Sequence, residues 1–181
     1  RISRRSKYLI FHFEKKLLLV HLGMSGKLLL MRSDDNTIFK TSFYYDLNIL
    51  QNHNHIYFNL NNGLVLIYND VRRFGFFKLY HTKQLNKIIF LKRLGLEPLS
   101  KKFNIKYFEK IVQNRKKNIK NLLMDQAFVS GLGNIYVNEV LFASKIYPLR
   151  TCSRLNKKEI KNLIFHIKKI LKFSISKGGS S

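Results

Sequence analysis

The chain has 181 residues, of which 45% are hydrophobic and 13% aromatic, so it can bury a core in one large or two small domains. Lys and Arg number 34 against 10 Asp and Glu, and the formal net charge of +24 favours a polyanionic partner such as nucleic acid. Cys152 is the only cysteine, which excludes an internal disulfide and a zinc site built on cysteines.

The charge alone leaves alternatives open. Lys, Asn, Ile and Phe are all abundant and have AT-rich codons, so part of the lysine excess is also explained by genome composition. An anionic membrane is the other polyanion, but no apolar run approaches the ~20 residues that a spanning helix needs. No signal peptide is recognisable, and Arg1 leads directly into a strand-like sequence. We therefore expect a cytoplasmic protein whose chain begins inside a fold.

Residues 1–97 are predicted to form a partial N-terminal β-sandwich domain. Three apolar runs within residues 7–32, and three more within residues 53–80, are typical of strands separated by turns. Asn61, Asn62 and Gly63 indicate a hairpin turn. No element is predicted for residues 33–50. The expected architecture is an antiparallel sandwich or flattened barrel, with further strands upstream of Arg1 because open sheet edges are unstable.

Residues 98–181 are predicted to form an all-α helix-two-turn-helix domain, so the fold class is α+β. Near Pro98 the apolar pattern changes from period two to a helical period. Helices are expected at about 104–114, 118–126, 134–145 and 156–176, with Asn104 as one capping residue.

The stretch from Asn118 to Lys145 carries the clearest functional signal. Gly131 and Gly133 are free to adopt positive φ, and Asn134 stands where the next helix would be capped. Backbone N–H groups at such a helix N-terminus are left unpaired and can bind an anion, so a phosphate is the expected guest. Arg115, Lys116, Lys117 and Lys120 add positive charge nearby, although such a cluster is also common on a solvated surface.

Two stretches of the predicted β domain have the same character. Lys7 enters a strand, where a lysine can bind a backbone phosphate and transfer a proton, or simply remain a solvated surface group. Gly23 and Gly26 bracket Met24 in a loop. An unbranched Met in that position fits a wedge entering a base stack, and a core Met in a plain turn is the alternative.

Residues 70–75, with the sequence DVRRFG, place adjacent arginines beside an aromatic ring on a turn. A guanidinium fork and a stacking ring suit phosphate and base contacts, and an ion pair of Asp70 with one arginine is the competing structural use. His53 and His55 alternate on a strand, but two histidines without a nearby carboxylate or cysteine are too few ligands, so no metal site is expected.

Seven segments, taken in order, resemble the formamidopyrimidine-DNA glycosylase family, and the resemblance extends over nearly all residues. These segments are HLGMSG, HNH with the NNG turn, DVRRFG, LGLEPL, IKNLLMDQ, GLGNIYVNEVLF and KGGSS. The resemblance implies a β-sandwich and a helix-two-turn-helix domain with DNA held between them. HLGMSG and DVRRFG favour this branch over the related endonuclease VIII group.

The resemblance also assigns roles by position. Lys7 matches the family's phosphate-binding lysine, which donates a proton in β-elimination. Met24, Arg72 and Phe74 match the residues that fill the gap left by a flipped base. The remaining positions correspond to phosphate, lesion-pocket or other DNA contacts: His21, His53, Arg73, Lys116, Lys120 and Asn134. Val71 and Asn121 stand where proline is common in the family, which loosens a turn without deleting a contact.

Two features of the family are not found in these residues. Its nucleophile is an N-terminal proline followed by a glutamate, and its C-terminal zinc finger brings four cysteines and one zinc ion. From this we expect an intact bifunctional glycosylase and AP lyase that excises 8-oxoguanine and formamidopyrimidine. The present chain is expected to bind poorly, to be inactive and to hold no cofactor.

The expected partner is double-stranded DNA with an oxidised base or an abasic site. The protein is expected to act as a monomer and not to bind a membrane. A non-catalytic DNA-binding relic is the alternative, because the catalytic segment is missing and the composition is AT-biased. An RNA-binding helix-two-turn-helix protein of ribosomal type would explain the helical half but not the sandwich motifs.

Overall fold

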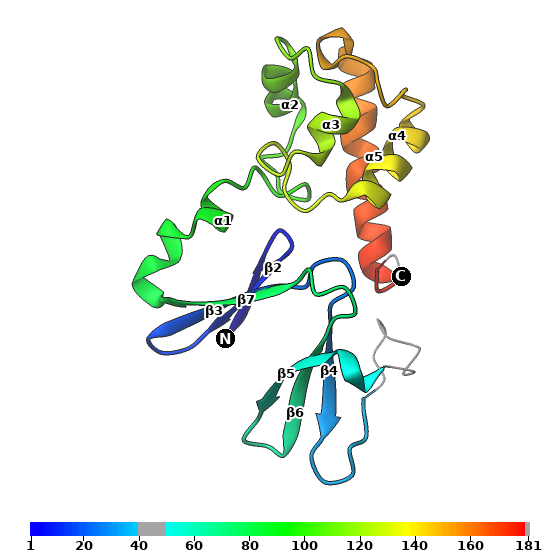
Figure 1. The fold of residues 1–181 in the computed structure, drawn as a ribbon. Helices are drawn as coiled ribbons and strands as arrows, with labels where there is room; N and C mark the ends of the chain where they lie inside the picture. Colours follow the sequence, from blue (N-terminus) through cyan, green and yellow to red (C-terminus); the bar gives the residue numbers. More distant parts are fainter. Residues whose placement is uncertain (40–49, 180–181) are drawn as a thin grey trace. The chain divides into compact units, whose positions relative to one another are not determined.

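The computed structural model describes residues 1–39 and 50–179. The chain divides into two compact units, Arg1–Asn86 and Lys87–Ser181. The first unit contains all the strands of the described residues and the second contains the helices α1 to α5 (Figure 1). The α+β class predicted from the sequence is confirmed. Most of the range 33–50, for which no element was predicted, lies outside the described residues, as do the last two residues of the terminal KGGSS segment.

The larger sheet has four antiparallel strands in the order β1-β2-β3-β7. These strands are β1 (Ile2–Arg5), β2 (Tyr8–His12), β3 (Lys16–His21) and β7 (Phe76–His81). The two-residue turn between β1 and β2 pairs Arg5 with Tyr8, and Tyr8 in turn pairs with His21. His21 pairs with Phe76 on β7, so the ends of four strands meet at one corner of the sheet.

The smaller sheet has three antiparallel strands in the order β4-β6-β5. They are β4 (Lys27–Arg32), β5 (Asn54–Asn59) and β6 (Leu64–Asn69), and a 3-10 turn, Gln51–His53, leads into β5. The β5-β6 register shifts between Asn54 and Ile56. The predicted Asn-Asn-Gly turn joins β5 to β6, with Gly63 at a φ of 74°.

Period-two alternation explains why these segments bury one face. On β3, Leu17 and Leu19 are fully buried, and on β6 Val65 and Ile67 are buried against Leu29 of β4. Phe77 of the larger sheet joins the two sheets, because its ring contacts the rings of Phe58 and Tyr68 of the smaller one.

All six predicted strands are present, and β1 is an additional strand for which no bounds were predicted. Three of its four residues are polar or charged, so the segment lacks the apolar run that marked the other strands. Its place in the sheet comes from pairing with β2, which is tertiary information that local pattern does not contain.

The second unit begins earlier than the predicted boundary between residues 97 and 98. The short helix α1 (Ile89–Lys92) follows a 3-10 segment, Thr82–Lys87, and the chain then packs on the helical turn. The Gly95 N–H donates to the Gln126 carbonyl at 2.8 Å, and the Ser130 N–H donates to the Leu96 carbonyl at 2.9 Å. These bonds tie the segment before Pro98 to the helices.

The helical unit contains α2 (Ile105–Val112), α3 (Ile119–Met124), α4 (Asn134–Ser144) and α5 (Lys157–Ser176), with a 3-10 turn, Cys152–Arg154, before α5. Helix α5 packs against α2 and α4, and α3 packs against α4 (Figure 1). The core takes residues from every one of these helices, including Phe108, Leu122, Leu123, Val137, Val140, Leu163 and Ile167. The predicted helices are confirmed with shorter ends.

Asparagine caps explain where three of these helices begin. Asn104, Asn118 and Asn156 each accept a hydrogen bond from the backbone N–H three residues ahead, and Asn156 forms a capping box with Glu159. Helix α4 is different, because its N-cap is Gly133 and no side chain caps it.

Within the described residues, no helix is both long enough and apolar enough to cross a membrane.

Candidate nucleic-acid interface

The corner where β1, β2, β3 and β7 meet carries Lys7 and His21. Lys7 lies in the turn between β1 and β2, and Ser6 beside it adopts a φ of 57°. Lys7 is an exposed residue, yet the protein around its amine removes part of its water and lowers its pKa. A lysine of lowered pKa can release a proton more readily than an ordinary surface lysine.

His21 is held on three sides. Its ring stacks on Phe76 with centroids 5.7 Å apart and contacts the Tyr8 ring at 5.0 Å. The Gly23 N–H donates to His21 Nδ1 at 3.0 Å, so the neutral ring carries its proton on Nε2. Burial lowers the pKa of His21, and the positive charge of Lys7 lowers it further. At neutral pH the ring is therefore a neutral donor.

Asp70 is the buried residue that organises the loops beside this corner. Its side chain is fully buried and accepts hydrogen bonds from the hydroxyls of Ser25 (2.5 Å) and Tyr68 (2.7 Å) and from the backbone N–H groups of Gly75 (3.0 Å) and Arg72 (3.3 Å). Burial by itself raises the pKa of this carboxyl, but these hydrogen bonds outweigh it and lower the pKa to about 2. The carboxylate thus bonds to hydroxyls and backbone, and no arginine side chain is among these partners.

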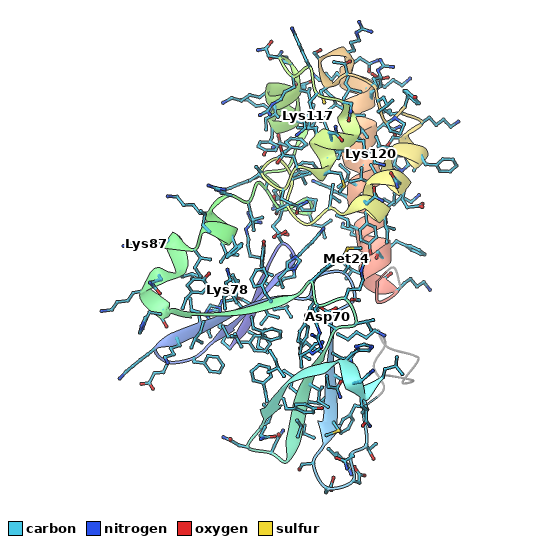
Figure 2. All side chains as sticks on the ribbon, viewed as in Figure 1. Met24, Asp70, Lys78, Lys87, Lys117 and Lys120 are labelled. Atoms are coloured by element: carbon cyan, nitrogen blue, oxygen red, sulfur yellow. The ribbon has the colours of Figure 1, made fainter. Side chains whose placement is uncertain are left out.

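The loops that Asp70 holds expose three predicted contact residues, which we call the loop site: Met24, Arg72 and Phe74 (Met24 and Asp70 are labelled in Figure 2). Met24 is 71% exposed and Phe74 is 56% exposed, so Met24 is not a core residue. The Arg72 guanidinium lies 4.7 Å from the centre of the Phe74 ring, which keeps both groups together at the surface.

Close backbone packing presses the two loops together. A Cβ built on Gly23, which has a φ of 70°, would come within 2.6 Å of the Gly75 nitrogen, so only glycine fits there. The Arg72 N–H also donates to Ser25 Oγ at 3.1 Å. The loop carrying Met24 and the loop carrying Arg72 are therefore one structural piece.

Arg73 and His53 flank the loop site in different ways. Arg73 is exposed and adopts a φ of 55°, which is costly for a residue with a side chain and is maintained by the bonds on either side of it. His53 contributes its backbone carbonyl, which accepts from the Asp70 N–H at 3.0 Å. The ring of His55 also bonds here, through Nε2 to the Asp70 carbonyl at 2.8 Å.

The second candidate site is the turn before α4, which we call the turn site (residues 126–134). Gln126 crosses this turn, since its amide oxygen accepts from the Gly131 N–H and its NH₂ group donates to the Leu132 carbonyl, both at 2.8 Å. Gly131 adopts a φ of 96°, whereas Gly133 has a φ of −118° and needs no glycine freedom. The sequence reading placed Gln126 on a helix and missed its bridging role.

Asn134 is the first residue inside α4, which corrects the expectation that it caps the helix. Its side chain is exposed and free to face a ligand. The first intrahelical bond runs from the Val137 N–H to the Gly133 carbonyl at 3.0 Å, so the three N–H groups before it have no helical acceptor. With no side chain capping them, these groups are oriented to bind an anion.

Basic residues beside α3 complete the helical site. Lys120 lies on α3, where its backbone N–H donates to the Pro148 carbonyl at 3.2 Å and its side chain is partly exposed (labelled in Figure 2). Lys116 is exposed in the loop before α3, and Lys117 forms a 3.5 Å ion pair with Asp125. Helices α3 and α4 pack together, so Lys120 and Asn134 lie on neighbouring helices of this unit.

The donors present do not fit a metal centre. Across residues 1–39 and 50–179, no three His, Cys, Asp or Glu side chains come together, and Cys152 is fully buried in the helical core. No chemical step is assigned to a metal in these residues.

Two family models match the chain. The formamidopyrimidine-DNA glycosylase N-terminal domain matches residues 1–77, and the formamidopyrimidine-DNA glycosylase H2TH domain matches residues 94–181. These ranges contain both candidate sites.

Relatives and solved structures agree with these models. Formamidopyrimidine-DNA glycosylases of Streptococcus pyogenes and Rickettsia bellii are each 42% identical over 99% of this chain, which spans 61% of their length. Lactococcus lactis Fpg in complex with an abasic site containing DNA is 37% identical with a TM-score of 0.83, and this chain covers 62% of it. The L. lactis mutant G226P in complex with Fapy-dG containing DNA has a TM-score of 0.84. By both of its units, then, this chain belongs to the formamidopyrimidine-DNA glycosylase family.

Proposed function

We propose that this chain is the DNA-contacting part of a base-excision repair glycosylase that removes oxidised purines and cleaves the strand at the resulting abasic site. The proposal rests on family membership and, within the structure, on one observation. The exposed trio Met24, Arg72 and Phe74 is fixed on two loops by a fully buried carboxylate, Asp70.

A trio built in this way can replace an extruded base. An unbranched Met side chain and a Phe ring are apolar wedges that can enter a base stack, and a guanidinium can hydrogen-bond the edge of the unpaired partner base. Inserting a wedge costs unstacking energy, and a wedge that is already fixed in position avoids an additional ordering cost. Asp70 supplies that fixation.

The flanking groups suit the backbone of the same nucleotide. The neutral His21 ring can donate from Nε2 to a phosphate oxygen, and the Lys7 amine of lowered pKa can bind a phosphate or transfer a proton. In the helical unit, the N–H groups at the start of α4, with Asn134 and Lys120, suit a second phosphate. The nucleophile that the resemblance implies, an N-terminal proline amine, is not among residues 1–181, so we assign no covalent step to them.

Borohydride trapping tests the proposed activity. The full-length gene product, mixed with a duplex that contains 8-oxoguanine, should yield a covalent protein-DNA adduct on reduction, because a Schiff base forms during AP lyase chemistry. The matched control is the same duplex with an undamaged guanine. A full-length product that binds the lesion duplex but yields no adduct would instead identify the non-catalytic DNA-binding relic.

The 181-residue chain is the second arm of the same experiment. We propose that it binds DNA weakly and forms no adduct. Its affinity for DNA should fall steeply with salt. A plot of log K against the logarithm of the salt concentration should have a slope of about −0.9 for each phosphate that the chain neutralises. An adduct formed by this chain would show that its own residues supply the nucleophile.

A further inference from the structure

Helix α5 has an exposed face that neither candidate site uses. Lysine occurs at Lys157, Lys158, Lys161, Lys168, Lys169, Lys172 and Lys177, and the only acid between residues 157 and 179 is Glu159. Glu159 is already engaged, because its carboxylate bonds the Arg150 guanidinium at 3.2 Å and the Asn156 N–H at 2.9 Å. The helix therefore presents almost uncompensated positive charge.

Helical spacing gathers part of this charge on one strip, which we call the α5 face: Lys158, Lys161, Phe165, Lys169, Lys172 and Phe173. At about 100° per residue these positions fall within roughly a third of the helix circumference. The opposite side of α5 carries Ile160, Leu163 and Ile167, which are buried in the core of the helical unit. The α5 face is thus the solvent side of a helix whose apolar side is already packed.

Two aromatic rings lie exposed among these lysines. Phe165 is 56% exposed and Phe173 is 64% exposed. The Lys169 amine lies 5.8 Å from the centre of the Phe165 ring, and the Lys177 amine lies 6.0 Å from that of Phe173. Beside Phe165 the surface forms an open hollow of about 530 Å³, lined also by Lys158, Lys161, Asn162 and Glu159, whose carboxylate is bonded to Arg150. The His166 ring also meets Phe165 edge-on, with centroids 5.1 Å apart. Each phenylalanine ring is therefore a partly exposed aromatic surface with a cation near it.

We infer that the α5 face binds single-stranded nucleic acid. Exposed rings interspersed with lysines are the combination that such binding uses, because bases stack on the rings while lysines neutralise the backbone. A duplex would use only the lysines, since its bases are already stacked. The strip from Lys158 to Phe173 is about 22 Å long at 1.5 Å per residue, long enough to contact several nucleotides of one strand.

The other polyanions fit this face less well. A helix that lies in a membrane surface inserts its apolar side, and that side of α5 is buried in the protein core. An acidic protein segment would pair with the lysines but would leave the two rings without stacking partners.

Fluorescence anisotropy with a labelled twelve-nucleotide poly-dT strand tests this inference on the full-length gene product. Phe165→Ala should weaken binding about tenfold, as expected when one stacking partner is lost, and Phe165→Tyr should restore it. The matched control is Phe142→Ala on α4, which removes a ring that is 85% exposed and lies outside the α5 face. Equal affinities for Phe165→Ala and Phe142→Ala would overturn the inference.

A charge-matched pair separates this face from the bulk charge. The double variant Lys158→Gln, Lys161→Gln should lose two phosphate contacts. The slope of log K against log salt concentration for poly-dT binding should therefore become smaller by about 1.4, at about 0.7 per contact. Lys106→Gln with Lys110→Gln removes two exposed lysines of α2 and should leave the salt dependence nearly unchanged. Equal effects of the two pairs, or binding of phosphatidylserine vesicles or polyglutamate that depends on Phe165, would overturn the inference.

Circular dichroism melts confirm that the compared variants are folded. The proposed glycosylase function is independent of this result, because Phe165→Ala should leave lesion-duplex affinity and borohydride trapping unchanged. If poly-dT binding does not depend on Phe165, the single-strand binding proposed for the α5 face is wrong, and the glycosylase proposal is unaffected.

Discussion

The loop site and the turn site both present surface groups from an irregular segment, but they are stabilised by different chemistry. The loop site is held by a buried carboxylate that accepts four hydrogen bonds. The turn site is held by a neutral amide, that of Gln126, which bonds two backbone groups of the turn. Hydrogen bonds to a charged group are about twice as strong as neutral ones, so the loop site should be the more rigid and the more sensitive to pH.

The difference fits the work proposed for each site. A wedge that enters a base stack must keep its position against the stacked bases, whereas a helix N-terminus contacts a phosphate at the DNA surface and needs less rigidity. The different chemistry of the two sites also predicts that each site can be disrupted by a substitution that leaves the other intact. Variants of Asp70 should change the loop site and spare the turn site, and variants of Gln126 should do the reverse.

The largest effect is expected for Asp70→Asn. Asparagine replaces one acceptor oxygen by a donor, which opposes donors already present, and the hydrogen bonds lose their charge. We expect a loss of about 3 kcal/mol in the free energy of unfolding, measured by urea denaturation. The control is Asp34→Asn, an exposed residue whose carboxylate accepts a hydrogen bond from the neighbouring Asp35 N–H. Equal stabilities of the two variants would contradict the role given to Asp70.

Acid should weaken the same interaction in the unmodified chain. The pKa of Asp70 falls from its ordinary 3.8 to about 2 on folding, so the folded state binds this proton less tightly than the unfolded state. The stabilisation is complete above pH ~4 and is lost as the pH falls towards 2, and it amounts to about 2 kcal/mol. Urea denaturation between pH 5 and pH 2 measures it. The acid sensitivity should be smaller in Asp70→Asn, and an unchanged pH profile in that variant would contradict the assignment.

A smaller effect is expected for Gln126→Leu, which removes both bonds across the turn. The free energy of unfolding should fall by about 1 to 2 kcal/mol, and affinity for every duplex should fall together because the start of α4 loses its fixed orientation. Gln113→Leu, at an exposed position after α2, is the matched control. If Gln126→Leu left DNA affinity unchanged, the turn before α4 would not contribute to DNA binding.

Sequence pattern was sufficient for six of the strands and for helices α2 to α5, but not for β1 or α1. The strands β2 to β7 follow from period-two apolar runs. Helices α2 to α5 follow from helical spacing, with asparagine caps on α2, α3 and α5. The motifs around Met24, Arg72 and Asn134 were recognisable because turns and glycines punctuate them.

The supporting residues were not predictable in the same way. Asp70 bonds Ser25, which is 45 residues away in the chain, whereas the sequence indicates only an ion pair of Asp70 with a neighbouring arginine. Gln126 was read as part of a helix, yet its side chain spans a turn. Local spacing indicates which segment is helix, strand or turn, but it does not indicate which distant donor a buried polar group meets.

The central claim is that the loop site contacts the base opposite the lesion and that the turn site contacts a phosphate. It is tested most directly with Arg72→Ala and Asn134→Ala variants of the full-length gene product. Each variant is titrated with lesion duplexes that differ only in the base opposite the lesion. Arg72→Ala should change the ratio of affinities among the opposite bases. Asn134→Ala should lower all affinities alike and leave that ratio unchanged. An unaltered ratio in Arg72→Ala, or an unaltered affinity in Asn134→Ala at moderate salt, would contradict the account.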